Sequence, residues 1–157
     1  MESKEITQAA ILAALYVAIG LVIPFISFGA IQCRVSDALY PLIAVLGTPA
    51  LIGLTLGHFI YNIYGFAAGF ALGPLDILLS PIIFLVAKIA IWKWGYRAVP
   101  IHVVAVALWV PYLVCMMVPT VPWVAYWSVV GTVGVGEAIA ELVLGIPLAM
   151  GVKARLQ

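Results

Sequence analysis

The chain has 157 residues, of which 66% are hydrophobic and only 8% are charged, and its formal net charge is +1. A water-soluble domain carries about 25% charged residues, so this chain cannot cover itself with a polar surface and its surroundings must be lipid. No basic run is present that would bind nucleic acid. Residues 1–157 are therefore expected to form a single transmembrane domain, located in the cell membrane as a multi-pass protein.

Apolar runs predict an all-α fold, a bundle of six membrane helices. An unbroken helix crosses the roughly 30 Å hydrocarbon layer in about 20 residues, and turn signals within the longer runs divide them into separate spans. The second predicted span is short, about 12 residues, so it either tilts or does not cross fully. In chain order, the predicted spans lie near residues 6–26, 36–47, 50–65, 73–93, 98–117 and 124–150.

Lysine and arginine residues predict the orientation of this bundle. With six spans both termini lie on the same side, and Lys88 is close enough to that side to snorkel toward it. The opposite side holds only Arg34. Because positive residues favour the cytoplasm, we expect cytoplasmic termini and an external position for Arg34. The other positive residues on the side of the termini are Lys4, Lys93, Arg97, Lys153 and Arg155.

A few ionisable residues lie within or beside the predicted spans, where burial is costly. Each is a candidate for a functional site. One alternative is an internal ion pair that fixes helix packing, such as Arg34 with Asp76 or Asp37. Another is that Asp37 caps the second helix. The residues in question are Arg34, Asp37, Asp76, Glu137 and Glu141.

Two pairs of polar residues are spaced four apart and share a helix face. In the pair Glu137 and Glu141 two like charges would repel, so one is protonated or lies nearer the cytoplasmic end. In the pair His58 and Asn62 the histidine can serve as a simple hydrogen bond between helices. Asn62 lies nearer the outer end and is the better candidate for binding a ligand.

Small residues recur at four-residue spacing in the first span, at Ala10, Ala14 and Ala18, and Gly53 and Gly57 form a GxxxG pattern in the third. Such stripes let helices approach closely, and packing within the chain is their default interpretation. Cys33 and Cys115, which belong to no C-x-x-C pair, are expected to be buried apolar residues rather than metal ligands or a disulfide.

The motifs of several catalytic classes are missing. The sequence contains no Walker A motif, no H-E-x-x-H and no G-x-S-x-G, and its two histidines are too far apart to suggest a zinc enzyme. We therefore expect no cofactor, no metal and no enzymatic activity. A solute-binding membrane protein fits better, and one this small lacks the paired repeats of many transporters, so another protein should supply the energy.

The segment SFGAIQCRVSDAL, residues 27–39, resembles the signature of the queuosine-precursor transporter family (QueT type), whose members are substrate-binding S components of energy-coupling-factor (ECF) transporters. Asn62, the GPLDILLSP segment around Asp76, the GE pair at Glu137 and LGIPL near the end follow in the family's order. The resemblance thus covers nearly the whole chain. Cys33 stands where an aromatic residue is expected, and Asp37 where Glu is common.

This resemblance implies a six-helix S component with cytoplasmic termini, which works with a transmembrane coupling subunit and two ATPase subunits. Ala10, Ala14 and Ala18 match the alanine stripe through which S components dock the coupling subunit. Family members are thought to topple in the bilayer and deliver their substrate inward as ATP is hydrolysed. The implied ligand is a 7-deazaguanine, the precursor of queuosine or archaeosine.

A guanine-like edge offers adjacent N–H donors that a carboxylate can accept as charge-assisted hydrogen bonds. Glu137 or Asp76 can supply this carboxylate. Asn62 and Gln32 can bind the lactam oxygen and the remaining nitrogens, and Arg34 can orient a carboxylate or close the loop over the site. Aromatic rings able to stack on a planar ligand are Tyr61, Tyr64 and Trp127.

Three alternatives remain from the sequence. The cargo of the S component can be another vitamin or a purine. The chain can instead be a small proton-coupled carrier that works as an oligomer. Glu137 and Glu141 can also form the acid and base of an intramembrane enzyme such as a prenyl-protein protease, although such an enzyme would need more histidines and a neighbouring arginine on those helices.

Overall fold

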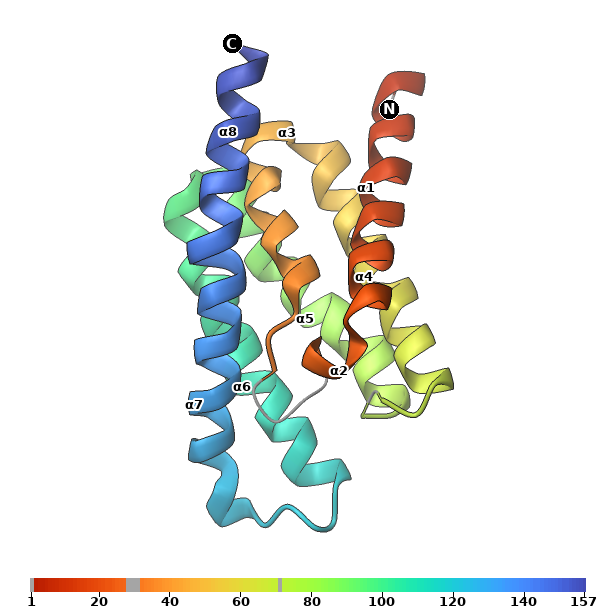
Figure 1. Ribbon diagram of the computed structural model, residues 1–157, viewed down its shortest axis with the longest axis vertical. Coiled ribbons are helices and arrows are strands. Elements are labelled where there is room, and N and C mark those ends of the chain that lie inside the picture. The colour runs from red at the N-terminus through yellow and green to blue at the C-terminus, as the bar shows by residue number, and fades with distance from the viewer. Residues whose placement is uncertain (1, 28–31, 71) are drawn as a thin grey trace.

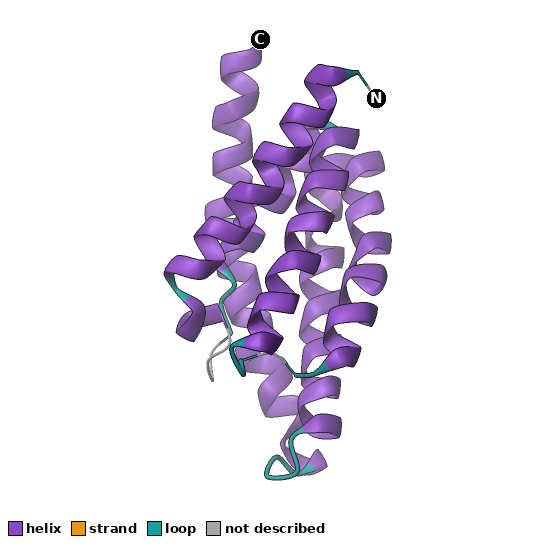
Figure 2. Cartoon of the chain, turned by 90° about the vertical axis from the view of Figure 1, so that its right-hand side faces the viewer, coloured by secondary structure: helices purple, strands orange, loops and turns teal. Residues whose placement is uncertain are grey.

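The computed structural model describes residues 2–27, 32–70 and 72–157, with the side chain of Phe25 excluded. All regular secondary structure in these residues is helical, and no strand occurs among them (Figure 2). The two chain termini lie at the same end of an elongated bundle (Figure 1). Residues 28–31, part of the segment that carries the family resemblance, lie outside the described residues.

The helices follow one another through short connections. Most are α-helices, but η1, η2 and η3 are 3₁₀ helices and η4 is a π-helical stretch. Their bounds are α1 Ser3–Val22, α2 Pro24–Ser27, η1 Val35–Leu42, α3 Ile43–Leu46, α4 Thr48–Ala67, α5 Pro74–Trp94, η2 Gly95–Ala98, α6 Val99–Met117, η3 Trp123–Ala125, α7 Tyr126–Ala138, η4 Ile139–Gly145 and α8 Ile146–Leu156.

Four helical stretches among the described residues are long and apolar enough to cross a membrane: Ser3–Val22, Thr48–Ala67, Pro74–Met117 and Trp123–Leu156. The third would be about 66 Å long if straight, twice the hydrocarbon thickness. It is not straight, because Gly95 adopts φ +67°, a conformation that favours glycine. α5 and α6 therefore fold back on each other as a helical hairpin.

The distribution of polar and apolar side chains is opposite to that in a soluble protein. Lys88 and Glu137 are fully buried, whereas Val22, Val86 and Val124 are 75%, 71% and 88% exposed. In water this arrangement would leave apolar surface exposed and bury charge, both unfavourable. In lipid it places the apolar side chains in hydrocarbon and the polar ones inside the bundle.

Glycines bring α1 and α4 into close contact. A Cβ atom on Gly53 would lie 2.3 Å from the carbonyl oxygen of Ala9, and one on Gly57 would lie 2.9 Å from Cβ of Tyr16. The GxxxG pattern therefore serves packing within the chain. The face of α1 that carries Ala10, Ala14 and Ala18 points away from this contact, and all three alanines are exposed.

The segment formed by η1 and α3 runs through the centre of the bundle (Figure 1). It rises about 22 Å, so it is shorter than the hydrocarbon layer. Every residue from Ser36 to Ile43 is buried. The π-helical stretch η4 approaches this segment closely at Gly145, where a Cβ atom would lie 2.7 Å from the carbonyl oxygen of Ala38.

One cation differs from the sequence-based expectation. Lys88 does not snorkel to the surface, because it is fully buried and its Nζ atom lies 4.3 Å from the centre of the Tyr40 ring. The sequence pattern missed this because Lys88 stands near a predicted span end, where a long side chain can usually reach water. Arg34 is only 4% exposed, so its charge lies inside the bundle.

Candidate functional site

A cavity of about 370 Å³ lies toward the end of the bundle opposite the termini, among the turns that follow α4 and α6. Valines from α6, α7 and the turn after α6 form most of its wall. Gln32, Arg34 and Asp76 add its polar groups. The lining residues are Gln32, Arg34, Phe70, Leu72, Asp76, Val110, Val114, Val118, Val121, Val129 and Val133.

Asp76 is held at the cavity by neighbouring side chains. Ser80, one turn later on α5, donates to its Oδ1 atom at 2.5 Å, and Trp109 on α6 donates from Nε1 to Ser80 Oγ at 2.8 Å. Asn62 on α4 donates to the backbone carbonyl oxygen of Asp76 at 3.2 Å. Among the described residues, no side chain donates to Oδ2 of Asp76.

Gln32 and Arg34 reach the cavity because the chain before η1 lies directly on α7. A Cβ atom on Gly136 would come within 2.1 Å of the Gln32 carbonyl oxygen, so only glycine allows this approach. Arg34 then extends toward α4, where its Nη1 atom lies 3.2 Å from Nε2 of His58. Its guanidinium carbon lies 5.8 Å from the centre of the Tyr61 ring.

Arg34 and Asp37 are connected by a chain of buried hydrogen bonds. A guanidinium can only donate, so Nε2 of His58 accepts from Arg34 and Nδ1 carries the ring hydrogen. Nδ1 lies 2.7 Å from the hydroxyl of Tyr40, which donates in turn to the Tyr16 hydroxyl at 3.0 Å. Tyr16 donates to Oδ1 of Asp37. Each donor is thereby matched to one acceptor.

This series of hydrogen bonds replaces the ion pair that the sequence suggested. Among the described residues, no salt bridge joins Arg34 to Asp37 or Asp76. Asp37 does not cap the helix with its side chain either, because it lies inside η1 and accepts from Tyr16. The hydrogen bonds instead tie η1 to both α1 and α4.

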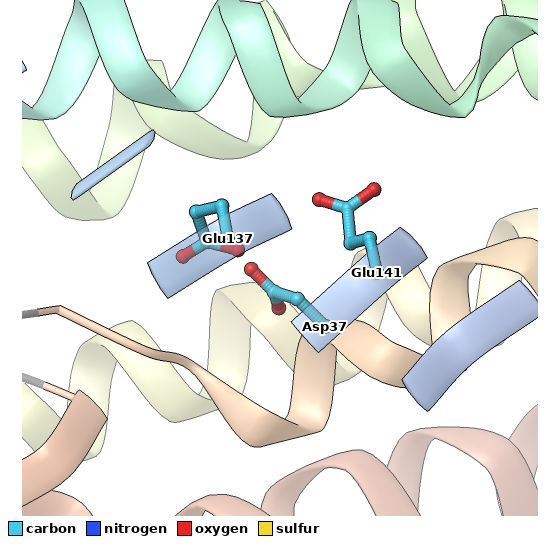
Figure 3. Close-up of side chains that lie close together, drawn as sticks. All are labelled: Asp37, Glu137 and Glu141. Carbon is cyan, nitrogen blue, oxygen red and sulfur yellow. The ribbon is translucent and has the colours of Figure 1, made fainter. Parts of the chain in front are cut away.

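Glu137 lies one turn after Val133, which lines the cavity, but is not itself among the lining residues. It belongs to a cluster with Asp37 and Glu141, in which one carboxylate oxygen of each lies within 4.8 Å of the others (Figure 3). Glu141, in the π-helical stretch, contacts Nδ1 of His102 at 2.7 Å. The cluster therefore lies behind the cavity, deeper in the bundle.

The structure brings three of the residues suggested as ligand contacts, Gln32, Arg34 and Asp76, to one cavity. The other two, Asn62 and Glu137, lie behind its wall. Tyr61, Tyr64 and Trp127, which the sequence offered as stacking rings, are not among the lining residues, and Trp127 is 72% exposed on the outside. The aromatic residue that does line the cavity is Phe70.

Sequence reasoning missed several of the buried polar partners. Ser80 follows Asp76 at the same four-residue spacing that singled out His58 and Asn62, so this signal was present. Tyr16, Tyr40 and Trp109 carried no signal, because aromatic residues are common throughout the chain.

Cys33 lies between the cavity residues Gln32 and Arg34 and is partly buried. It is a free thiol, as is the buried Cys115. Burial raises the pKa of the Cys33 thiol, which disfavours the reactive thiolate form. Cys115 is buried as expected, whereas Cys33 is only partly buried.

The comparisons with known proteins agree with the resemblance in the sequence. The profile described as QueT transporter matches residues 6–154, which is nearly the whole chain. No curated protein and no solved structure gives a match. Together with the long apolar helices, the family match makes this a multi-pass integral membrane protein. The chain belongs to the QueT transporter family.

Proposed function

We propose that this chain is the substrate-binding S component of an ATP-driven ECF importer. It captures a 7-deazaguanine, a precursor of queuosine or archaeosine, from outside the cell. The S component then delivers this ligand inward, together with a transmembrane coupling subunit and two ATPase subunits. The observation that carries the proposal is the cavity of about 370 Å³ in which Gln32, Arg34 and Asp76 face valine walls. Its size and its few polar groups are typical of a small-molecule site.

The polar groups of the cavity suit a guanine-like edge. Asp76 offers Oδ2 to adjacent N–H groups of the ligand, and Gln32 has both a donor and an acceptor for the lactam. Phe70 and the valines can cover the flat faces of the ring. Arg34, anchored on His58, can orient the ligand or hold the loop. Of the two carboxylates that the sequence suggested, the position of Asp76 favours it over Glu137.

The proposed topology has six passes, the second of which is the short η1–α3 segment. In this arrangement the end with both termini is cytoplasmic and the cavity faces outward. The positive-inside rule supports it, because the cations other than the buried Arg34 and Lys88 belong to the termini or to the α5–α6 turn. These cations are Lys4, Lys93, Arg97, Lys153 and Arg155.

The alanine stripe on α1 is the proposed docking site for the coupling subunit. Ala10, Ala14 and Ala18 are exposed and line a shallow groove with Val17 and Ile60. Packing within this chain does not account for the stripe, since α4 contacts the other face of α1. Small exposed residues allow the backbone of a partner helix to approach closely.

The ligand assignment is tested by calorimetric titration of purified Asp76→Asn with 7-deazaguanine precursors. A hydrogen bond to a charged group contributes about 1.5–3 kcal/mol, so we expect affinity to fall about 10- to 100-fold. Ser128→Ala is the matched control, because Ser128 is exposed and bonds only its own helix end. Wild-type affinity in Asp76→Asn, with normal folding, would contradict the assignment.

A small proton-coupled carrier is the second candidate, favoured by the buried carboxylates of Asp37, Glu137 and Glu141. It is distinguished by reconstituting this chain alone in vesicles under a pH gradient. A carrier would accumulate the ligand inside without any ATPase, whereas an S component would bind it and show no accumulation until the coupling and ATPase subunits and ATP are added.

A further inference from the structure

Three carboxylates from three different elements meet in the interior of the bundle. Asp37 comes from η1, Glu137 from α7 and Glu141 from η4, and each is at most 1% exposed. One oxygen of each lies within 4.8 Å of the other two, and in Figure 3 the carboxylate of Glu137 points toward that of Asp37. Three ionised carboxylates this close would repel one another strongly where water is excluded.

The three carboxylates differ in their hydrogen-bond partners. Asp37 accepts from the Tyr16 hydroxyl, and Glu141 pairs with Nδ1 of His102 at 2.7 Å. Glu137 has neither kind of support: both of its oxygens are buried, and neither has a hydrogen-bond partner among the described residues. An ionised carboxylate without a donor is the costliest state in such a site.

The nearby cations do not compensate for all three charges. Arg34 directs Nη1 to His58, and the buried Lys88 places Nζ over the Tyr40 ring. Even if both cations are fully charged, two positive groups face three carboxylates, which leaves one negative charge in excess. His102 does not alter this count when its ring is neutral and donates to Glu141.

We infer that Glu137 binds a proton and shares it with Asp37, so that this pair is a proton-binding site inside the bundle. The proton comes from bulk water and forms an O–H bond on Glu137. The new hydroxyl supplies the donor that Glu137 otherwise lacks, and the Asp37 carboxylate accepts it. Glu137 is the protonated partner because Asp37 and Glu141 each already have a donor.

A metal ion at the same place fits less well. Three carboxylates can hold a cation in principle, but Arg34 and Lys88 already bring positive charge to the centre and would repel it. A proton removes the excess charge without adding any ligand volume.

Infrared spectroscopy of the purified full chain in lipid nanodiscs at pH 7 tests the inference. A protonated carboxyl has a C=O stretch separate from that of carboxylates, and the band shifts in D₂O. We expect this band in the wild type and its loss in Glu137→Gln. The matched control is Glu5→Gln, the same chemical change in the first turn of α1, which leaves the charge of the cluster unchanged and should keep the band.

A wild type without the band would overturn the inference, as would a band that survives in Glu137→Gln or disappears in Glu5→Gln. A band that appears only after Na⁺, K⁺, Mg²⁺ and Ca²⁺ are removed would also overturn it, because the carboxylates would then hold a cation. If Glu137→Gln does not fold, Asp37→Asn provides the test, since a changed acceptor must shift the band. An unshifted band in Asp37→Asn would contradict the sharing of the proton.

Discussion

Arg34 and Asp37 are three residues apart in the sequence, yet they are joined through His58, Tyr40 and Tyr16 rather than directly. The donor-only guanidinium at one end and the acceptor-only carboxylate at the other fix the direction of every hydrogen bond between them. This series of hydrogen bonds holds the cavity residue Arg34 in place and ties η1 to two neighbouring helices.

Removing the Tyr40 hydroxyl interrupts this series of hydrogen bonds at its centre. In Tyr40→Phe, Nδ1–H of His58 loses its acceptor and Tyr16 loses a donor, both in a fully buried site. We expect a loss of stability of about 1–3 kcal/mol, measured by unfolding in detergent. Tyr126→Phe is the matched control, because the Tyr126 hydroxyl bonds Leu108 at the protein surface. If the two changes have equal effects, the hydrogen bonds of Tyr40 have no structural role.

Gly136 is predicted to be the least replaceable glycine of α7. In Gly136→Ala the new Cβ atom would collide with the Gln32 carbonyl oxygen, which forces the segment before η1 off the helix. We expect a destabilisation of about 1–3 kcal/mol and weaker ligand binding. Gly131→Ala on the same helix meets no atom within 4 Å and should be neutral or slightly stabilising. If Gly136→Ala behaves like Gly131→Ala, the segment does not lie where the structure places it.

The orientation can be tested by cysteine labelling in a Cys33→Ala, Cys115→Ala background. Thr120, in the turn after α6, and Gln157, at the C-terminus, are both exposed and lie at opposite ends of the bundle. With intact cells and a membrane-impermeant maleimide, we expect Thr120→Cys to react and Gln157→Cys to react only after lysis. The reverse pattern would place the cavity on the cytoplasmic side and contradict import.

The docking stripe is tested by Ala14→Trp, which fills the shallow groove on α1. We expect ligand binding to persist, because the groove is on the outside of the bundle, and the yield of complex with the coupling subunit to fall at least about tenfold, equivalent to 1.4 kcal/mol. Val86→Trp places the same bulk on an exposed position of α5 and should leave assembly unchanged. Normal assembly of Ala14→Trp would remove the stripe from the interface.

The sequence predicted some features of this molecule well because they depend on local signals. Apolar length and turn residues identified helices such as α5 and α6, whose bounds lie within a residue or two of the ranges 73–93 and 98–117. The rarity of charge drew attention to Arg34 and Asp76, and the structure places both at the cavity. A charged residue in an apolar chain is informative without any knowledge of packing.

Other features depend on which helices meet, and no local pattern contains that information. The burial of Lys88 and the contact between His102 and Glu141 join elements distant in sequence. The hydrogen bonds made by Tyr16 and Tyr40 likewise require η1 to pass through the centre of the bundle. Phe70 lies between the predicted spans 50–65 and 73–93, and its place at the cavity follows from how that turn packs against α6 and α7.

The most direct test of the central claim is a tryptophan-fluorescence titration of the purified chain in detergent. Trp109 reports on the cavity, since it is linked to Asp76 through Ser80. The ligands would be 7-deazaguanine precursors, guanine, riboflavin, thiamine and biotin. The account predicts saturable, tight quenching by a 7-deazaguanine and its loss in Trp109→Phe. No response to any deazaguanine, with clear binding of another vitamin, would contradict the proposed cargo.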